Sequence, residues 1–268
     1  MGEPRRRPRR PTRRQDESAI ELELPAPGSE IEKLLAEGRI VACQPLDWGS
    51  NYDFAVAIAP LGDDDDSGAN ATIAIYKPRR GEAPLWDFPD GTLYRREYAA
   101  YLTSVALNWR FIPPTVIRDG PYGVGSVQLY VEPARKDVSF NRSGYRTQLM
   151  QVSLFDSLTN NADRKAGHCF IGRDGKLWGI DHGLTFHHVP KLRTVIWDFC
   201  GDPIPSDLLA ALERLLDARD EASRLWGQLE RLLSEVEVEA CQRRLQRLLS
   251  ERRFPRLDPS RNLPRGFF

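Results

Sequence analysis

The stretches NNADRKAGH at residues 160–168 and IDHG at residues 180–183 decide the fold of this chain. Between them lie two short apolar runs separated by Arg173-Asp174-Gly175-Lys176, which is a turn sequence typical of a β-hairpin. A hairpin brings the end of its second strand back beside the start of its first. The sequence therefore predicts that Asp163 and Asp181, which lie 18 positions apart, face one pocket.

The residue types around these two aspartates favour metal-assisted phosphoryl chemistry, because two carboxylates meet there beside an arginine and a histidine. A second interpretation stays open from the residues alone. Asn160, Asn161 and Asp163 are also residues that satisfy a sharp turn without any chemical role.

Working outward toward the N-terminus, the sequence predicts a helix and three strands. Ser29-Glu30-Ile31-Glu32 is a capping box that begins a helix, and this helix ends near Gly38. Strands are expected over residues 39–46, 53–59 and 72–76, the last followed by Lys77. A turn at residues 47–52 contains Gly49, Ser50 and Asn51, whose backbone amides are candidates to cover phosphates.

The remaining elements are mostly helical. Residues 93–107 have helical periodicity and carry Glu97, and residues 144–158 are expected to form a buried helix. Short strands are expected at residues 116–117 and 127–131. Residues 207–253 are expected to form two or three amphipathic helices that pack on the catalytic lobe, although a partner-binding coiled coil is an alternative. A strand-rich half followed by a helical half predicts an α+β fold of two lobes with a ligand cleft between them.

Composition limits the class of protein. The chain has 268 residues and no formal net charge, and no apolar run is long enough to span a membrane. Residues 1–28 are rich in arginine and proline, so we expect a disordered tail that solubilises the protein or contacts an acidic partner. The four cysteines lack metal-binding spacing and are expected to be reduced thiols of a cytoplasmic protein.

The order of these parts resembles a protein-kinase-like fold: a glycine-containing hairpin, a strand lysine, a helix glutamate, an Asp-Arg loop and an Asp-x-Gly motif. The Asp163-Arg164-Lys165 loop with Asp181-His182-Gly183 is similar to the phosphatidylinositol 3-/4-kinase-like branch, where the motifs are D-R-H-x-x-N and D-F-G. It also resembles HipA-type kinases and secretory-pathway casein kinases. It is also similar to an uncharacterised bacterial group of such proteins, and the resemblance covers about residues 30–200.

The resemblance implies roles for the residues of the first lobe. Lys77 would neutralise the nucleotide phosphates, and Glu97 would orient the Lys77 side chain. The alternatives are that Lys77 lies in a solvated basic loop and that Glu97 forms a surface pair with Arg95 or Arg96. The remaining candidates for nucleotide binding are Gly49, Ser50, Asn51 and Glu132, the last in the segment between the lobes, where backbone groups would meet adenine.

The resemblance also implies roles for the central motifs. Asp163 would position an acceptor hydroxyl and take its proton, and Arg164 would hold the loop or balance its charge. Asp181 would bind the metal. His168 lies at the position where the family has a metal-binding Asn. Three roles follow as alternatives: His168 would bind a softer metal such as manganese, contact phosphate, or have a structural role only.

The expected function is therefore transfer of the γ-phosphate of ATP to a hydroxyl, with Mg²⁺ or Mn²⁺. The acceptor is a protein or a small molecule, because the segment after Asp181 lacks the cationic run expected for a lipid head group. Two alternatives remain: a pseudokinase or nucleotide-binding scaffold, and a metal phosphohydrolase using His182, His187 and His188. The catalytic domain is expected over residues 29–255, divided near residue 132, with a tail over residues 256–268.

Overall fold

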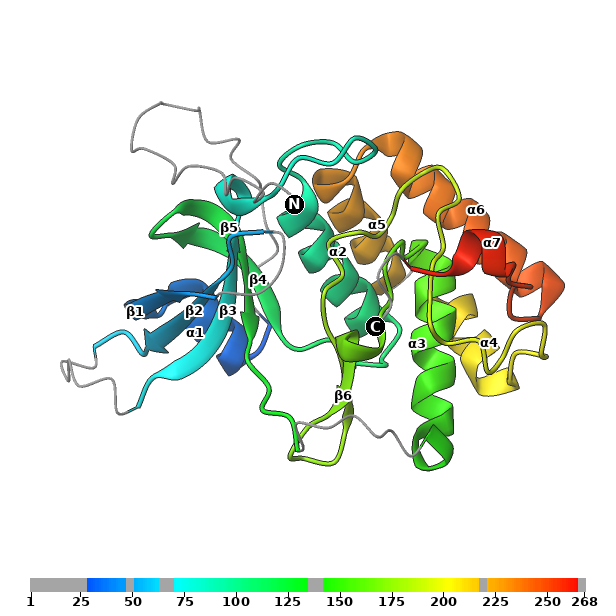
Figure 1. The fold of residues 1–268 in the computed structure, drawn as a ribbon, viewed down its shortest axis with the longest axis horizontal. Helices are drawn as coiled ribbons and strands as arrows, with labels where there is room; N and C mark the ends of the chain where they lie inside the picture. The colour runs from blue at the N-terminus through cyan, green and yellow to red at the C-terminus, as the bar shows by residue number, and fades with distance from the viewer. Residues whose placement is uncertain (1–27, 47–50, 63–69, 135–141, 217–220, 265–268) are drawn as a thin grey trace, which may run out of the picture.

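In the computed structural model, residues 28–46, 51–62, 70–134, 142–216 and 221–264 are described. They form two lobes. Figure 1 shows a β-sheet with one short helix on one side and a larger group of helices on the other. This is the two-lobed kinase-like, α+β architecture that the sequence predicts.

The first lobe is built on a five-stranded antiparallel sheet with the strand order β1-β2-β3-β5-β4. Its strands are β1 (Arg39–Pro45), β2 (Phe54–Ala59), β3 (Thr72–Pro78), β4 (Thr115–Gly120) and β5 (Gly123–Leu129). Buried and part-exposed residues alternate along β2, as expected for a strand with one face on a core. That face packs with helix α1 (Glu30–Glu37) around Leu35, Val56, Tyr76 and Val127.

The second lobe is mostly helical. Its elements are α3 (Arg146–Thr159), the small hairpin β6 (Cys169–Ile171) and β7 (Leu177–Gly179), α4 (Ser206–Arg214), α5 (Glu221–Leu232), α6 (Glu235–Glu251) and α7 (Pro259–Asn262). The leucines of α4, α5 and α6 are buried in one core with α3, so the prediction that this region packs on the rest of the second lobe is confirmed.

Helix α2 (Leu93–Ala106) connects the lobes. It packs against β4 and β5 of the sheet and also against α5 (Figure 1). Tyr94, Tyr98 and Tyr101 belong to the same buried cluster as Leu229 of α5. The core of the second lobe therefore includes a helix that precedes it in the sequence.

Most of the predicted elements are confirmed, including the capping box at Ser29 and the central hairpin. Lys77 lies within β3 rather than after it. The predicted tail contains α7, where Asn262 donates to the carbonyl oxygen of Leu192 and accepts from the amide of Thr194. The Arg-rich segment, the acidic loop at residues 63–66 and the turn residues Gly49 and Ser50 lie outside the described residues.

Two further expectations concern composition. No helix within the described ranges is long and apolar enough to cross a membrane. All four cysteines are free: Cys169 and Cys241 are buried, Cys43 is partly buried and Cys200 is exposed.

Candidate functional site

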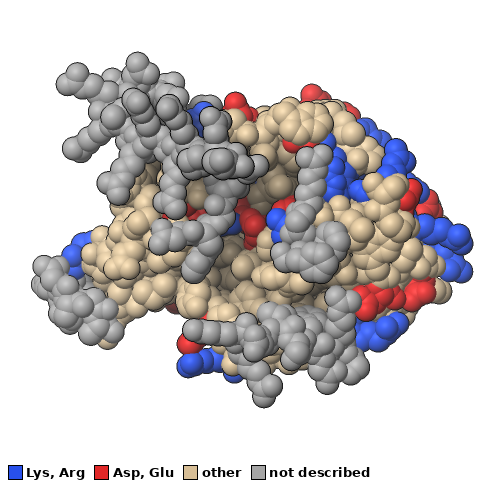
Figure 2. Space-filling model, in the orientation of Figure 1, with Lys and Arg blue, Asp and Glu red and all other residues tan. Residues whose placement is uncertain are grey.

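A cleft of about 710 Å³ lies between the two lobes. Its apolar walls come from both lobes and include Leu46, Ile75, Leu129, Val131, Phe170 and Ile180. Its charged lining residues are Asp53, Lys77, Glu82, Glu97, Asp163, Lys165 and Asp181. Figure 2 shows acidic and basic atoms side by side near the middle of the molecule. Apolar walls with a small number of charged groups are typical of a cleft that binds and orients a small ligand.

Lys77 is one of these charged lining residues, and it contacts two of the others. Its Nζ is 2.6 Å from Glu97 Oε1 on α2 and 3.2 Å from Asp181 Oδ1. Burial lowers the pKa of Lys77, but the negative charges of Asp181, Glu97 and Asp53 raise it above its ordinary value. The ammonium group therefore stays charged, and it contacts two carboxylates, of Glu97 and Asp181, that lie far apart in the sequence. The predicted pairing of Lys77 with Glu97 is present in the structure, and neither of the two alternative interpretations describes these residues.

Asp181 follows strand β7 and has a left-handed backbone conformation, with a φ of 61°. This conformation is uncommon for a residue other than glycine, and it is often found at functional sites. The next amide, of His182, donates to Glu97 Oε2 at 2.9 Å, so α2 helps to hold this backbone. The ammonium of Lys77 keeps the pKa of Asp181 below its ordinary value, so the carboxylate is ionised.

Asp163 lies in the loop that follows α3. Asn160 ends this helix in a left-handed conformation, and the side-chain oxygen of Asn161 accepts from the amide of Asp163 at 3.0 Å. Asp163 and Asp181 both line the cleft, as the hairpin argument predicts. The Oδ2 of Asp163 is 2.8 Å from Nζ of Lys165, a lining residue that the sequence analysis did not select.

Arg164 does not line the cleft. Its side chain is completely buried, where it forms an ion pair with Asp156 of α3 at 2.9 Å and donates to the carbonyl oxygens of His168 and Ile180. Its NH2 group is 2.7 Å from Nε2 of His182. Of its two predicted roles, this geometry fits holding the loop: Arg164 joins the Asp163 loop to the Asp181 segment through their backbones.

His182 occupies the position of the motif phenylalanine, and it is fully buried between the rings of Phe111 and Phe155. Because a guanidinium only donates, Nε2 of His182 accepts from Arg164 and Nδ1 carries the hydrogen. Burial, followed by the charge of Arg164, holds the pKa of His182 well below its ordinary value. The imidazole is therefore neutral, as its contact with a cation requires.

His168 lies beside the second aspartate, with its Nε2 atom 3.3 Å from Asp181 Oδ2. Burial lowers the pKa of His168, so the imidazole is neutral. Its Nδ1 accepts from the amide of Lys165 at 3.4 Å, so Nε2 carries the hydrogen and faces the carboxylate of Asp181. Within the described ranges, no group of three or more His, Cys, Asp or Glu side chains is arranged to hold a metal ion. Asp163 and Asp181 both line the cleft and offer oxygen ligands of the kind that Mg²⁺ takes together with phosphate and water, whereas the Nε2–H of His168 is not a metal ligand in this arrangement.

Asp53 is a cleft residue that the sequence analysis missed. It lies directly before β2, and burial raises its pKa to about 6. The register pairs Phe54 with Tyr76, so Asp53 and Lys77 follow at the same end of two neighbouring strands. Knowledge of this strand register would have identified Asp53 as a neighbour of Lys77. The loop between the strands is long, so the sequence does not reveal how they pair.

The remaining predicted nucleotide contacts have different positions. Asn51 lines the cleft, and its side-chain oxygen accepts from the amide of Ala83 at 2.9 Å. Glu132 is not among the lining residues, whereas Tyr130, Val131 and Pro133 are. The carboxylate of Glu132 instead pairs with Arg173 at 2.6 Å, because the β6–β7 turn packs beside it.

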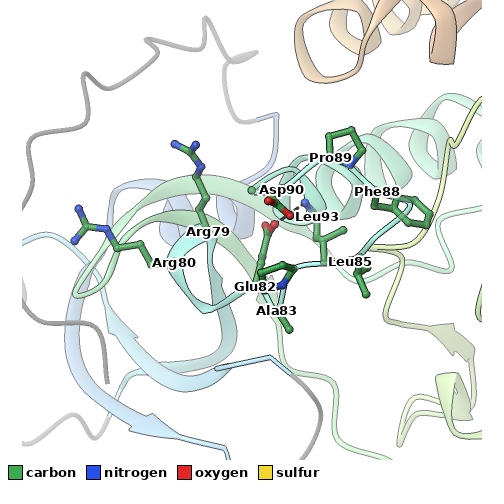
Figure 3. A pocket seen from close by; sticks show the side chains of 11 residues that line it. Arg79, Arg80, Glu82, Ala83, Leu85, Phe88, Pro89, Asp90 and Leu93 are labelled. Atoms are coloured by element: carbon green, nitrogen blue, oxygen red, sulfur yellow. Dashed lines mark hydrogen bonds between the residues drawn. The ribbon is translucent and has the colours of Figure 1, made fainter. Parts of the chain in front are cut away.

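A second, smaller cavity of about 240 Å³ lies next to the cleft, in the segment between β3 and α2. Figure 3 shows the Glu82 side chain directed at the start of α2. Its carboxylate accepts from the amides of Leu93 and Tyr94 at 3.1 and 2.9 Å. Glu82 therefore satisfies the first free amides of the helix that carries Glu97.

The histidines proposed for a phosphohydrolase are not gathered into one site. His187 packs on Phe88 and hydrogen-bonds the carbonyl oxygen of Asp87, while His182 is enclosed beside Arg164. His187 and His188 stack on each other. This arrangement gives no support to a histidine metal centre.

Comparisons with known sequences identify two relatives, and no protein-family model matches the chain. Protein Rv2133c of Mycobacterium tuberculosis (strain ATCC 25618 / H37Rv) is 35% identical over 269 residues, which covers 86% of this chain and 93% of that protein. Phosphatidylinositol 4-kinase gamma 3 of Arabidopsis thaliana is 31% identical over 109 residues, which covers 36% of this chain and 18% of that protein.

Among solved structures, hydra Fam20 with sugar has a TM-score of 0.56 at 14% identity, covering 82% of this chain and 86% of that chain. The Golgi casein kinase has a TM-score of 0.51 at 17% identity, covering 82% and 73%. The same kinase with Mn/ADP bound has a TM-score of 0.52 at 16% identity, covering 82% and 74%. These similarities show a shared kinase-like fold.

Proposed function

This chain belongs to the family of Protein Rv2133c. From its kinase-like fold and the residues of its cleft, we propose that it is an ATP- and divalent-metal-dependent phosphotransferase. One observation carries the proposal. Lys77 from β3, Glu97 from α2, and the two motif aspartates Asp163 and Asp181 all line the same cleft. These are the residue types that a kinase needs for phosphate, metal and acceptor, so their presence in one cleft supports the proposal.

The charges of the cleft favour a metal-bound nucleotide. Among the described lining residues, five carry carboxyl groups and only two, Lys77 and Lys165, carry ammonium groups. A nucleoside triphosphate alone would be repelled by this excess of negative charge. A divalent ion held by Asp181 would neutralise charge on the terminal phosphates. The neighbour that carries Mn/ADP supports this combination.

The chain's own residues then have distinct roles. Lys77, fixed by Glu97, binds phosphate oxygens, and the apolar walls hold the base. Asp163 orients the acceptor hydroxyl and takes its proton, while Lys165 stabilises charge on the transferred group. Arg164 and Asp156 hold the two aspartate-bearing segments at a fixed separation, which in-line transfer needs.

The family is, in this proposal, a bacterial branch of the phosphatidylinositol 3-/4-kinase-like group that acts in the cytoplasm on a protein or small-molecule hydroxyl. The 109-residue match to a plant phosphatidylinositol 4-kinase and the mycobacterial relative support the branch. Against a phosphoinositide acceptor, Lys191 is engaged by Asp87 at 2.7 Å.

The test is mass spectrometry of the protein after incubation with ATP and Mg²⁺ or Mn²⁺, alongside measurement of MgATP affinity. A gain of phosphate supports the proposal. A gain of AMP would replace it with nucleotidyl transfer, and binding without any gain or ATP turnover would favour a nucleotide-binding scaffold.

Two variants separate binding from chemistry. Lys77→Met is expected to weaken MgATP binding roughly 10- to 100-fold, because a charge-assisted hydrogen bond contributes about 1.5–3 kcal/mol. Asp163→Asn is expected to lower kcat roughly 10²- to 10⁴-fold with little change in MgATP affinity. An Asp163→Asn protein with full transfer activity would remove Asp163 as the base.

A further inference from the structure

Two adjacent residues of α2 reach in different directions. Successive residues of a helix point about 100° apart, so Glu97 and Arg96 cannot face the same neighbour. Glu97 faces Lys77, whereas the Arg96 side chain is 1% exposed and extends into the helical lobe. The alternative interpretation, in which Glu97 forms a surface ion pair with Arg96, is therefore wrong.

The contacts of Arg96 join α2 to two parts of the second lobe. Its NH2 group is 2.7 Å from Glu237 Oε1, in the first turn of α6. Its NH1 group donates to the carbonyl oxygen of Thr185 at 2.8 Å. Its guanidinium also lies 5.1 Å from the centre of the Phe88 ring. The two terminal nitrogens of the guanidinium thus donate to two different parts of the second lobe.

Both partners are themselves fixed. Glu237 belongs to the capping box of α6, where its Oε2 atom accepts from the amide and hydroxyl of Ser234. Thr185 lies four residues after Asp181, and its hydroxyl donates to the carbonyl oxygen of His182 at 2.7 Å. The Arg96 contacts therefore end on a helix terminus and on the segment that carries Asp181.

Removing either partner would leave a buried charge without compensation, so this pair cannot open at low cost. Glu237 is nearly as buried as Arg96, and although burial raises its pKa, the charge of Arg96 brings it below the ordinary value. The pair is thus ionised, and a single charge-assisted hydrogen bond, from NH2 of Arg96 to Oε1 of Glu237, joins α2 to α6.

We propose that the Arg96–Glu237 pair is a permanent latch that sets the position of α2, so that the Lys77–Glu97 pair forms without nucleotide or a partner. The inference rests on the proposed function, since it concerns how the nucleotide site is assembled. Arg96 is a positioning residue: it acts through α2 and touches no nucleotide. An enzyme built this way is assembled before its substrates arrive and is not switched by movement of α2.

The central experiment measures the coupling between Lys77 and Glu97 in two backgrounds. MgATP affinity is measured for a double-mutant cycle of Lys77→Met and Glu97→Gln in the native chain and again with Arg96→Met. Arg96→Met is expected to weaken MgATP binding roughly 10- to 100-fold, because a small displacement of a positioning element is costly. The coupling between Lys77 and Glu97 is expected to fall toward zero.

Two variants serve as matched controls. Arg95 is the neighbouring arginine, and it stays partly exposed beside the Tyr94 ring. Asp87 also crosses between the lobes, to Lys191, without belonging to α2. Arg95→Met and Asp87→Asn are both expected to keep the Lys77–Glu97 coupling and to change MgATP affinity less than about twofold.

Amide hydrogen exchange keeps the test independent of activity. Arg96→Met is expected to speed exchange in residues 93–106 and 182–187 of the nucleotide-free protein, and Arg96→Lys is expected to recover part of the protection. A folded Arg96→Met protein with native coupling and native exchange would overturn the latch. If the native chain bound no MgATP, the proposed function would fail, and exchange alone would decide the latch. If Arg96→Met did not fold, Glu237→Gln would take its place in both measurements.

Discussion

Asp53 shows, at the residue scale, how the tertiary structure changes the chemistry of a side chain. It lies in the cleft near Asp181 and Glu97, and burial raises its pKa to about 6 from an ordinary 3.8. Because the folded protein binds this proton more tightly than the unfolded chain, protonation favours folding. The stabilisation is complete below pH 3.8 and is lost as the pH rises through about 6.

Asp53→Asn is therefore expected to stabilise the nucleotide-free protein at pH 7.5 by about 2 kcal/mol, because the amide removes a buried charge. The gain is expected to shrink as the pH falls from 6 to 4. Denaturant unfolding at a series of pH values measures it. A gain that is the same at every pH would show that the ionisation of Asp53 is not its source.

The site residues differ in how far the sequence predicts them. Asp163 and Asp181 are close in sequence and joined by one hairpin, so local turn chemistry predicts that they meet. Lys77 and Glu97 follow from the family resemblance. Asp53 and Arg96 were missed, because their partners depend on strand register and on a helix 141 residues away. Glu132 was selected because backbone groups between the lobes would meet adenine, but it does not line the cleft, and its carbonyl oxygen accepts from the amide of Arg173.

At the scale of elements, α2 determines the geometry of the cleft. Its own N-cap residue, Thr92, makes no side-chain capping bond, and the carboxylate of Glu82 supplies that contact from the preceding segment. The end of the helix is thus stabilised by a residue 11 positions away. Because Glu97 lies on the same helix, the contact also supports the orientation of Lys77.

Glu82→Ala is expected to lower the free energy of unfolding by about 1–2 kcal/mol, since two amides at the start of α2 lose their acceptor. MgATP binding is expected to weaken as well. Urea denaturation checks the first effect, and calorimetry checks the second. Glu30→Ala, at an exposed pair with Lys33, is the control and is expected to change stability by less than about 0.5 kcal/mol.

For the whole molecule, the two larger hydrophobic cores of the described residues do not follow the order of the chain. The sheet and α1 enclose one core around Val56, while the tyrosines of α2 join the core of the helical lobe with Leu229. Since α2 also packs on the sheet, the lobes share an element. We expect them to unfold in one cooperative transition.

Leu229→Ala is expected to lower the free energy of unfolding by about 2–5 kcal/mol, because Leu229 is fully buried in the core that includes α2. The loss is expected to appear in a single transition by both tryptophan fluorescence and circular dichroism. Val56→Ala, in the other core, is expected to shift the same transition. Two separated transitions, of which Leu229→Ala moves only one, would contradict a shared unfolding unit.

By itself, the sequence determined the elements and the central motif, because turn residues, caps and apolar periodicity act over a few positions along the chain. It therefore predicted the two lobes and the placement of Asp163 and Asp181 in one cleft. Only the tertiary structure decided the pairing of β2 with β3, which brings Asp53 to Lys77, and the burial of Arg96 against Glu237. Those contacts join segments that are far apart in the chain. Their energies depend on how completely the packed lobes exclude water, and a local sequence pattern does not predict this.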